Sequence, residues 1–258
     1  MRIKCLIIFI ISLYFQSMPV NGKEIRLANG EWPPYLGKGL PKYGAISHIV
    51  TEAFHRVGLN VRYEFFPWVR ALHVAHESFD GTLVWAKTPQ RQQNFFYSEP
   101  VMIDKVAIFY HKDKPIRWND IEDLKPYRVA IMRGYNNGNE MAKAEASGEY
   151  NFVTVTSETH ALKMLFHRRI DIAVIDNTVG LELIRKDYSK KEQSLFIAHP
   201  KSVVARPLHV LLSRKFAINE LYISKFNVAL QEMKKDGTYD VIYQNMLSGK
   251  YKPLSAKD

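Results

Sequence analysis

Cysteine is almost absent from this sequence, which has one, Cys5, among 258 residues. A single thiol forms no disulfide within the chain and offers no cysteine cluster for zinc. The fold must therefore be stabilised by its hydrophobic core. Hydrophobic residues make up 47% of the chain, which is enough for one large domain or two smaller ones.

Long hydrophobic runs are also absent. The longest, residues 5–15, is shorter than the roughly 20 residues that a membrane-spanning helix needs. It follows two basic residues and precedes the small residues Val20 and Gly22, an arrangement typical of a secretory signal peptide. We therefore predict that residues 1–22 are a cleaved signal and that the protein is periplasmic. An uncleaved anchor is the alternative.

The chain has no recognised nucleic-acid or catalytic motif. Its net charge is +10, and removal of residues 1–22 with two basic and no acidic residues leaves 10 − 2 = +8. The basic residues are spread along the chain, so we expect no nucleic-acid partner. Neither a nucleophile elbow, a zinc-protease motif nor a phosphate-binding loop is present. His73 and His76 lack a third metal ligand at a recognised spacing, and we expect no catalytic residue, metal or cofactor.

Apolar periodicity predicts alternating strands and helices in two successive stretches. In the first stretch we predict strands at 23–29, 61–65 and 82–86 and helices from 45, 68 and 89. A strand at 106–111 precedes a polar passage into the second stretch, in which we predict strands at 127–132, 151–156, 170–176 and 194–199, with helices at 140–146, 159–168 and 179–186. A strand at 207–213 and two helices end the chain.

This alternation is typical of parallel α/β sheets, whose ligands bind at the carboxyl ends of the strands. The final strand and helices have no partner strands of their own, so they must join an earlier unit. We predict a signal at 1–22, one lobe from 23–112 and 205–258, and a second lobe from 113–204. Two chain crossings between the lobes would then form a hinge.

Arg91 lies just inside a predicted helix start. Thr88 is suited to cap this helix, and Pro89 suits its first position. A guanidinium beside open backbone N–H groups favours a carboxylate held by two hydrogen bonds. The alternative is an ordinary exposed arginine on a surface helix.

Asp176 ends a strand so apolar that it should be buried on both faces. A carboxylate there would face a cleft between the lobes, opposite Arg91. The two side chains would together suit a zwitterion, with its carboxylate at Arg91 and its ammonium at Asp176. Alternatively, Asp176 simply caps the helix that follows it.

Aromatic residues follow three strands of the predicted first lobe. Trp32, Trp68 and Trp85 each lie in or beside such a loop, and Tyr35 shares the loop of Trp32. Apolar walls for a ligand are wanted at these positions, although packing in the core is the alternative for each one.

A loop of the second predicted lobe is a further candidate. Arg133, Tyr135 and Asn136 precede a helix there, and their backbone N–H groups are candidates to bind an anion.

Three segments together resemble the family 3 periplasmic solute-binding proteins, the amino-acid-binding partners of ABC importers. They are KTPQRQQNFFYSEP, RRIDIAVID and LQEMKKDGTYDVIYQNML, in the order that the family has them. The resemblance covers nearly the whole chain after residue 22. It implies an α/β, two-lobed periplasmic binding protein fold of type II, the venus flytrap, with a hinge of two chain crossings.

The resemblance also implies roles for particular residues. Arg91 would hold the α-carboxylate of an amino acid and Asp176 its ammonium, while Trp32 would stack on the ligand and Trp68 would face it. Two segments depart from the family pattern. They are Val84–Lys87, where small hydroxyl residues are usual, and Gly134–Asn136. These changes favour an aromatic or modified amino acid, or a cation held over rings.

We therefore expect a monomeric, non-enzymatic binding protein that captures a small, amino-acid-like solute for an ABC permease. Two alternative functions are compatible with the same resemblance. A cyclohexadienyl dehydratase would need a general acid, and no second cleft carboxylate besides Asp176 is evident in the sequence. A ligand-sensing module that serves a membrane sensor protein would share the same pocket.

Overall fold

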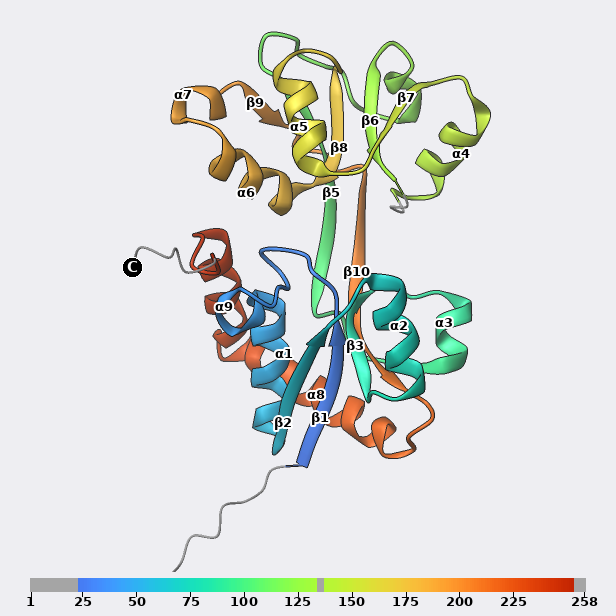
Figure 1. The fold of residues 1–258 in the computed structure, drawn as a ribbon, viewed down its shortest axis with the longest axis vertical. Helices are drawn as coiled ribbons and strands as arrows, with labels where there is room; N and C mark the ends of the chain where they lie inside the picture. The colour runs from blue at the N-terminus through green and yellow to red at the C-terminus, as the bar shows by residue number, and fades with distance from the viewer. Residues whose placement is uncertain (1–22, 134–136, 253–258) are drawn as a thin grey trace, which may run out of the picture.

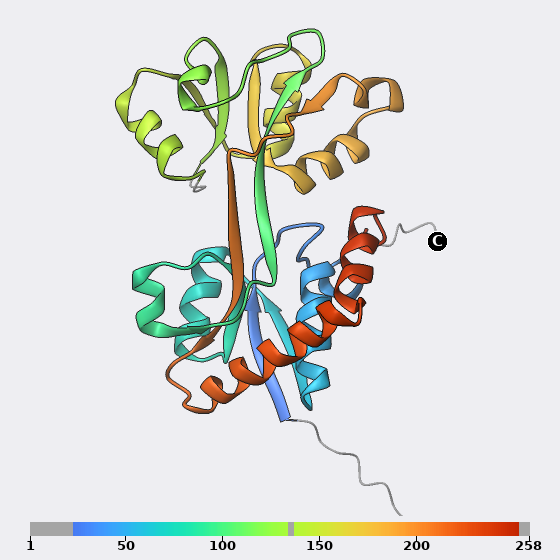
Figure 2. The ribbon, with the colours of Figure 1, turned by 180° about the vertical axis from the view of Figure 1, so that it is seen from behind.

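The computed structural model describes residues 23–133 and 137–252. It has two lobes that are joined by two long strands, β5 (Met102–His111) and β10 (Val204–Ser213) (Figure 1). We call the lobe that contains β1 the first lobe and the lobe that contains β6 the second lobe. The same two strands cross between the lobes when the molecule is seen from behind (Figure 2).

The first lobe is built from elements near both ends of the described chain. They are β1 (Lys23–Asn29), η1 (Pro41–Tyr43), α1 (Ala45–Arg56), β2 (Leu59–Phe65), α2 (Trp68–Glu77), β3 (Gly81–Trp85), α3 (Pro89–Asn94), β4 (Phe95–Tyr97), α8 (Ile218–Lys235) and α9 (Thr238–Leu247). The second lobe is built from the middle of the chain. Its elements are η2 (Ile121–Leu124), β6 (Arg128–Met132), α4 (Asn139–Ser147), β7 (Asn151–Val155), α5 (Glu158–Phe166), β8 (Ile172–Asp176), α6 (Asn177–Asp187), α7 (Lys190–Gln193) and β9 (Phe196–Ala198).

Eight of the strands form one continuous path, in the order β2-β1-β3-β10-β5-β8-β6-β7, while β4 pairs with β10 and β9 pairs with β5 beside it. The pairs of β1 with β2 and β3 are parallel, as are those of β6 with β7 and β8. Strand β10 is antiparallel both to β3 and to β5. The last strand therefore returns to the first lobe, and the predicted two-crossing hinge is confirmed. The short elements β4 and α7 were not predicted from the sequence.

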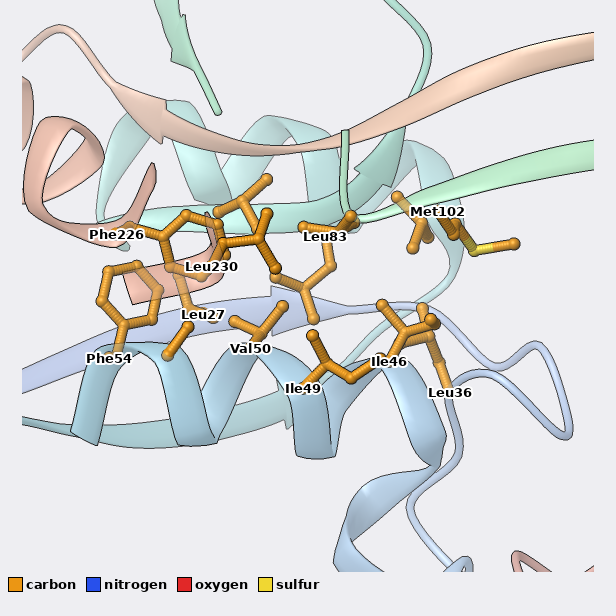
Figure 3. Close-up of a cluster of buried hydrophobic side chains, with 14 of the residues drawn as sticks. Leu27, Leu36, Ile46, Ile49, Val50, Phe54, Leu83, Met102, Phe226 and Leu230 are labelled. Carbon is orange, nitrogen blue, oxygen red and sulfur yellow. The ribbon is translucent and has the colours of Figure 1, made fainter. Parts of the chain in front are cut away.

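The core of the first lobe lies between its sheet and the helices α1 and α8 (Figure 3). Phe54 of α1 and Phe226 of α8 pack with ring centroids 4.7 Å apart, and Leu27 and Leu83 contribute from the sheet. Each fully buried side chain of this size contributes about 1.5–3 kcal/mol. The apolar face predicted for the helix from residue 45 is thus the face that α1 buries.

The core of the second lobe lies on both faces of β8. Ile172 and Val174 belong to one buried cluster, and Ala173 and Ile175 belong to another on the opposite face. The prediction that this strand is buried on both faces is confirmed. Among the described residues, no helix is long and apolar enough to cross a membrane.

Candidate ligand-binding site

Arg91 lies in the first turn of α3, as predicted. The side-chain oxygen of Thr88 accepts a hydrogen bond from the backbone N–H of Arg91 at 3.2 Å, which confirms the predicted cap. Nη1 of Arg91 donates to the carbonyl of Ala86 at 2.9 Å, and this bond uses one of the five guanidinium N–H groups. Within the described part of the chain, no carboxylate forms an ion pair with Arg91.

The half-buried Arg91 side chain lines an open groove between α2 and α3. The groove has a volume of about 640 Å³, and Trp68, Trp85 and Thr88 line it as well. Burial lowers the pKa of Arg91 from its ordinary value, although a guanidinium remains charged at any physiological pH. A partly desolvated cation on an aromatic wall is a strong site for a carboxylate.

The four predicted aromatic residues form a continuous row of contacts. The guanidinium carbon of Arg91 lies 4.5 Å from the ring centroid of Trp85. The Trp85 and Trp68 ring centroids are 5.5 Å apart, and those of Trp68 and Trp32 are 6.5 Å apart, both edge to face. The ring centroid of Trp32 lies 4.8 Å from that of Tyr35. The carboxyl ends of three different strands are thus joined by one row of ring contacts, which we call the aromatic row (Trp32, Tyr35, Trp68, Trp85).

Two backbone features position this row. A Cβ added at Gly30 would lie 2.4 Å from Cε2 of Trp68, so only glycine lets the indole pack against the end of β1. Val84, the residue before Trp85, has a φ of +58°, a left-handed conformation that is rare for a β-branched residue.

Asp176 is buried, with 6% of its surface exposed. Its Oδ1 accepts a hydrogen bond from the backbone N–H of Val179 at 2.7 Å. Asp176 therefore caps α6, which confirms the alternative prediction that it caps the helix that follows it. It also accepts from the hydroxyl of Tyr35, at 3.1 Å to Oδ1 and 3.3 Å to Oδ2. Tyr35 belongs to the first lobe and Asp176 to the second, and the loop after β1 and helix α6 lie on the facing sides of the two lobes (Figures 1 and 2).

A second buried carboxylate, Asp104 on β5, was missed from the sequence. Burial, and next the contact with Asp104, raise the pKa of Asp176 to about 8. Asp104 is fully buried and forms an ion pair with Arg206 of β10. The signal was its place in β5, where it shares the inward-facing positions of Met102 and Val106. A charged side chain at such a position is stable only when it is paired with another buried polar or charged group.

The remaining predicted residues are less informative. Arg133 is exposed and follows β6 directly, and its backbone N–H donates to the carbonyl of Val155 at 2.9 Å, so that group is already used. Tyr135 and Asn136 lie outside the described residues. In residues 23–133 and 137–252, no group of three His, Cys, Asp or Glu residues is placed to hold a metal ion.

The predicted site therefore divides into two parts with a shared wall. Arg91 contacts one end of the aromatic row, and Asp176 bonds Tyr35 at the other end. No hydrogen bond or ion pair between Arg91 and Asp176 is found in the described structure. A hydrogen-bond donor for a carboxylate, Arg91, and an acceptor for a cation, Asp176, are thus connected by four aromatic rings.

A comparison with known protein families identifies the family of this chain. The sequence pattern of the bacterial extracellular solute-binding proteins, family 3, matches residues 42–249. This chain belongs to that family. The matched range includes α1 to α9, with Trp68, Trp85, Arg91 and Asp176 inside it.

Relatives of this family 3 protein are distant. The amino-acid-binding protein AabA of Dichelobacter nodosus is 23% identical over 208 residues, which are 80% of this chain and 79% of AabA. An amino acid ABC transporter substrate-binding protein from Streptococcus pneumoniae, solved with L-arginine bound, superposes with a TM-score of 0.66. It is 16% identical over 90% of this chain and 96% of the other. A histidine kinase sensor domain also superposes with a TM-score of 0.66, at 20% identity over 88% of this chain and 97% of the other. At these identities the solved structures establish the fold, which is that of periplasmic binding proteins.

Proposed function

We propose that this family 3 protein captures a small zwitterionic solute, an amino acid or a derivative of one, between its lobes. One observation carries the proposal: the aromatic row runs from Arg91 at one end to Asp176 at the other. The carboxylate of the solute would pair with Arg91 and its cationic nitrogen with Asp176. The rest of the solute would lie against the rings, whose faces also favour a cation.

Binding would work through closure of the lobes. A ligand favours the closed state by the amount that its contacts are better there than in the open state. Strands β5 and β10 connect the lobes, and near the proposed site Tyr35 bonds Asp176 while Val179 and Leu183 of α6 pack against the core of the first lobe. The ligand would add contacts to both lobes and so shift the population towards closure.

The proposal extends to the cellular setting. We propose that residues 1–22 are a cleaved signal, that the protein is a periplasmic monomer, and that it passes an unaltered solute to an ABC permease. The lobe bounds 23–112 with 205–258 and 113–204 belong to the same proposal. Support comes from AabA, named as amino-acid-binding, and from the pneumococcal ABC transporter protein. The similarity to the histidine kinase sensor domain supports a membrane sensor protein as the second candidate partner.

A thermal-shift screen of residues 23–258 tests the function. The screen should contain amino acids, their aromatic and methylated derivatives, and organic acids that lack nitrogen. A ligand at 100 times its Kd adds about 2.7 kcal/mol to the unfolding free energy, which raises the Tm visibly. Hits among α-amino acids support the proposal, whereas hits confined to acids without a cationic nitrogen contradict the role of Asp176.

The absence of turnover needs its own measurement. The ligand should be recovered unchanged after prolonged incubation, and prephenate and arogenate should not be consumed. Conversion of either compound would instead support the dehydratase alternative.

A further inference from the structure

Asp104 is a fully buried acidic residue on β5, one of the two strands that join the lobes. Its side chain has no solvent exposure, and one oxygen, Oδ2, pairs with Nε of Arg206. The other oxygen, Oδ1, has no hydrogen-bond partner among the described residues. An unpartnered charged oxygen at a buried site is strongly unfavourable, so a donor belongs beside it.

The neighbouring strand, β8, ends at a second buried acid, Asp176. Strands β5 and β8 pair with Val106 opposite Asp176, and Asp104 lies two residues before Val106 on the same face of β5. This register places Asp104 diagonally across from Asp176 on the paired strands, and the carboxyl of Asp104 adds to burial in raising the pKa of Asp176. Ionised carboxylates only accept hydrogen bonds, so two neighbouring buried carboxyls are bridged only by a proton or by a cationic group.

The surroundings leave one negative charge to be balanced. Three segments supply the groups that face the two acids: Tyr35 from the loop after β1, Arg206 from β10 and Tyr243 from α9. With both acids ionised and both tyrosines neutral, the total is −2 + 1 = −1. Burial keeps the tyrosine hydroxyls neutral by raising the pKa of Tyr35 and of Tyr243.

We propose that Asp104 and Asp176 form a single site for the cationic nitrogen of the ligand, an ammonium or guanidinium group, and that a proton occupies this site in the ligand-free protein. The ligand cation takes the place of the proton, which leaves to solvent, so the charge of the site is conserved. Asp104 is then a residue that selects for cationic ligands. This inference rests on the proposed function and adds to it Asp104 and the exchange of a proton.

Proton release on binding tests the exchange directly. L-Arginine is the probe, titrated calorimetrically into the protein at pH 6 and pH 8 in buffers of different ionisation enthalpy. We expect close to one proton released per ligand at pH 6, and a Kd that tightens up to about tenfold for each pH unit towards 8. Equal Kd values at pH 6 and pH 8, without proton release, overturn the inference.

A matched pair of variants tests Asp104 itself. Asp104→Asn should weaken L-arginine binding at pH 8 at least tenfold and reduce the proton release measured at pH 6. Glu99→Gln removes the same charge from an exposed residue nearby and should change neither. If Asp104→Asn weakens binding but releases the same number of protons, Asp104 is only structural and the inference is wrong.

Titration of the ligand-free protein separates this inference from the proposed function. Carbon NMR of the aspartate carboxyls should show one group that titrates far above the ordinary range, and its midpoint should fall in Asp104→Asn. If no such group exists, the inference fails whatever the solute screen finds. If another amino acid binds without releasing a proton, the inference fails while the proposed function stands.

Discussion

The hydroxyl of Tyr35 lies 3.1 Å from Oδ1 of Asp176 and joins a loop of the first lobe to the cap of α6 in the second. The bond is buried at both ends, with 1% of Tyr35 and 6% of Asp176 exposed. Since the same hydroxyl ends the aromatic row, any solute that pairs with Asp176 must share it with Tyr35 or displace it. Under the proposed function, ligand binding at Asp176 would therefore alter this hydrogen bond between the lobes.

Removal of this hydroxyl should affect binding as well as stability. Tyr35→Phe is expected to lower the unfolding free energy by about 1–3 kcal/mol, because a buried carboxylate loses a donor, and to change the Kd of the ligand. Tyr63→Phe is the control, since the Tyr63 hydroxyl donates to the carbonyl of Ser47 within the first lobe. Urea denaturation and calorimetry measure both effects. A change in Kd of the same size in both variants would contradict a special role for the cross-lobe bond.

Arg91→Ala should weaken binding strongly and leave the ligand-free protein folded. The guanidinium makes one hydrogen bond, to Ala86, and lies over Trp85, contacts that together stabilise the fold by about 1–2 kcal/mol. Loss of a charged hydrogen-bond pair to a carboxylate should weaken binding at least about tenfold. Arg62→Ala, which removes an exposed arginine paired with Glu64, is the control. A variant that unfolds would show that Arg91 is structural.

The stability of the ligand-free protein should fall as the pH rises from about 4 to about 8. Burial, together with Asp104, raises the pKa of Asp176 to about 8, whereas an aspartate in the unfolded chain has a pKa of about 3.9. Between these values the folded state binds more protons than the unfolded state, so the unfolding free energy decreases with pH by up to about 1.4 kcal/mol per unit. Asp176→Asn should lack this slope.

Asp236→Asn is the control for that measurement. Hydrogen bonds from Thr238, and then from Arg56, lower the pKa of Asp236 to about 2, so this carboxyl is ionised in both states above pH 5. Its variant should keep the wild-type slope from pH 5 to 8. Parallel profiles for wild type and Asp176→Asn would show that Asp176 is ionised in the folded protein.

The aromatic row depends on a close approach between Gly30 and Trp68. A Cβ at residue 30 would lie 2.4 Å from Cε2 of the indole, so Gly30→Ala must displace Trp68 and should cost about 1–3 kcal/mol. Gly39→Ala changes the same loop where no atom lies within 4 Å of the new Cβ and should be nearly neutral. The fluorescence of the tryptophans and the Kd should change only in Gly30→Ala. Identical behaviour of the two variants would contradict the packing role.

Local sequence patterns predicted most of this fold because most of its signals are local. Thr88 directly precedes α3 and caps it through the N–H of Arg91, three residues later in the sequence. A continuous apolar run marks β8. Asp104 was missed because its partners, Asp176 and Arg206, lie 72 and 102 residues along the chain and meet it only through strand pairing. The sequence also left open whether Asp176 is a helix cap or a ligand-binding residue. Its contact with Tyr35 comes from the other lobe and so leaves no local signal in the sequence.

Val84 stores backbone strain next to the aromatic row. Its φ of +58° costs a non-glycine residue about 1–3 kcal/mol, whereas glycine adopts it without steric penalty. Glycine in a strand is ordinarily about 0.5–1 kcal/mol less stable than alanine. At residue 84 we expect the opposite order, with Val84→Gly at least as stable as Val84→Ala in urea denaturation. Leu83, fully buried in the same strand, should show the ordinary order, with Leu83→Ala more stable than Leu83→Gly. If alanine is better at both positions, Val84 is unstrained. If the order reverses at Val84 alone, the strain fixes the backbone just before Trp85 and so helps to hold its ring beneath Arg91.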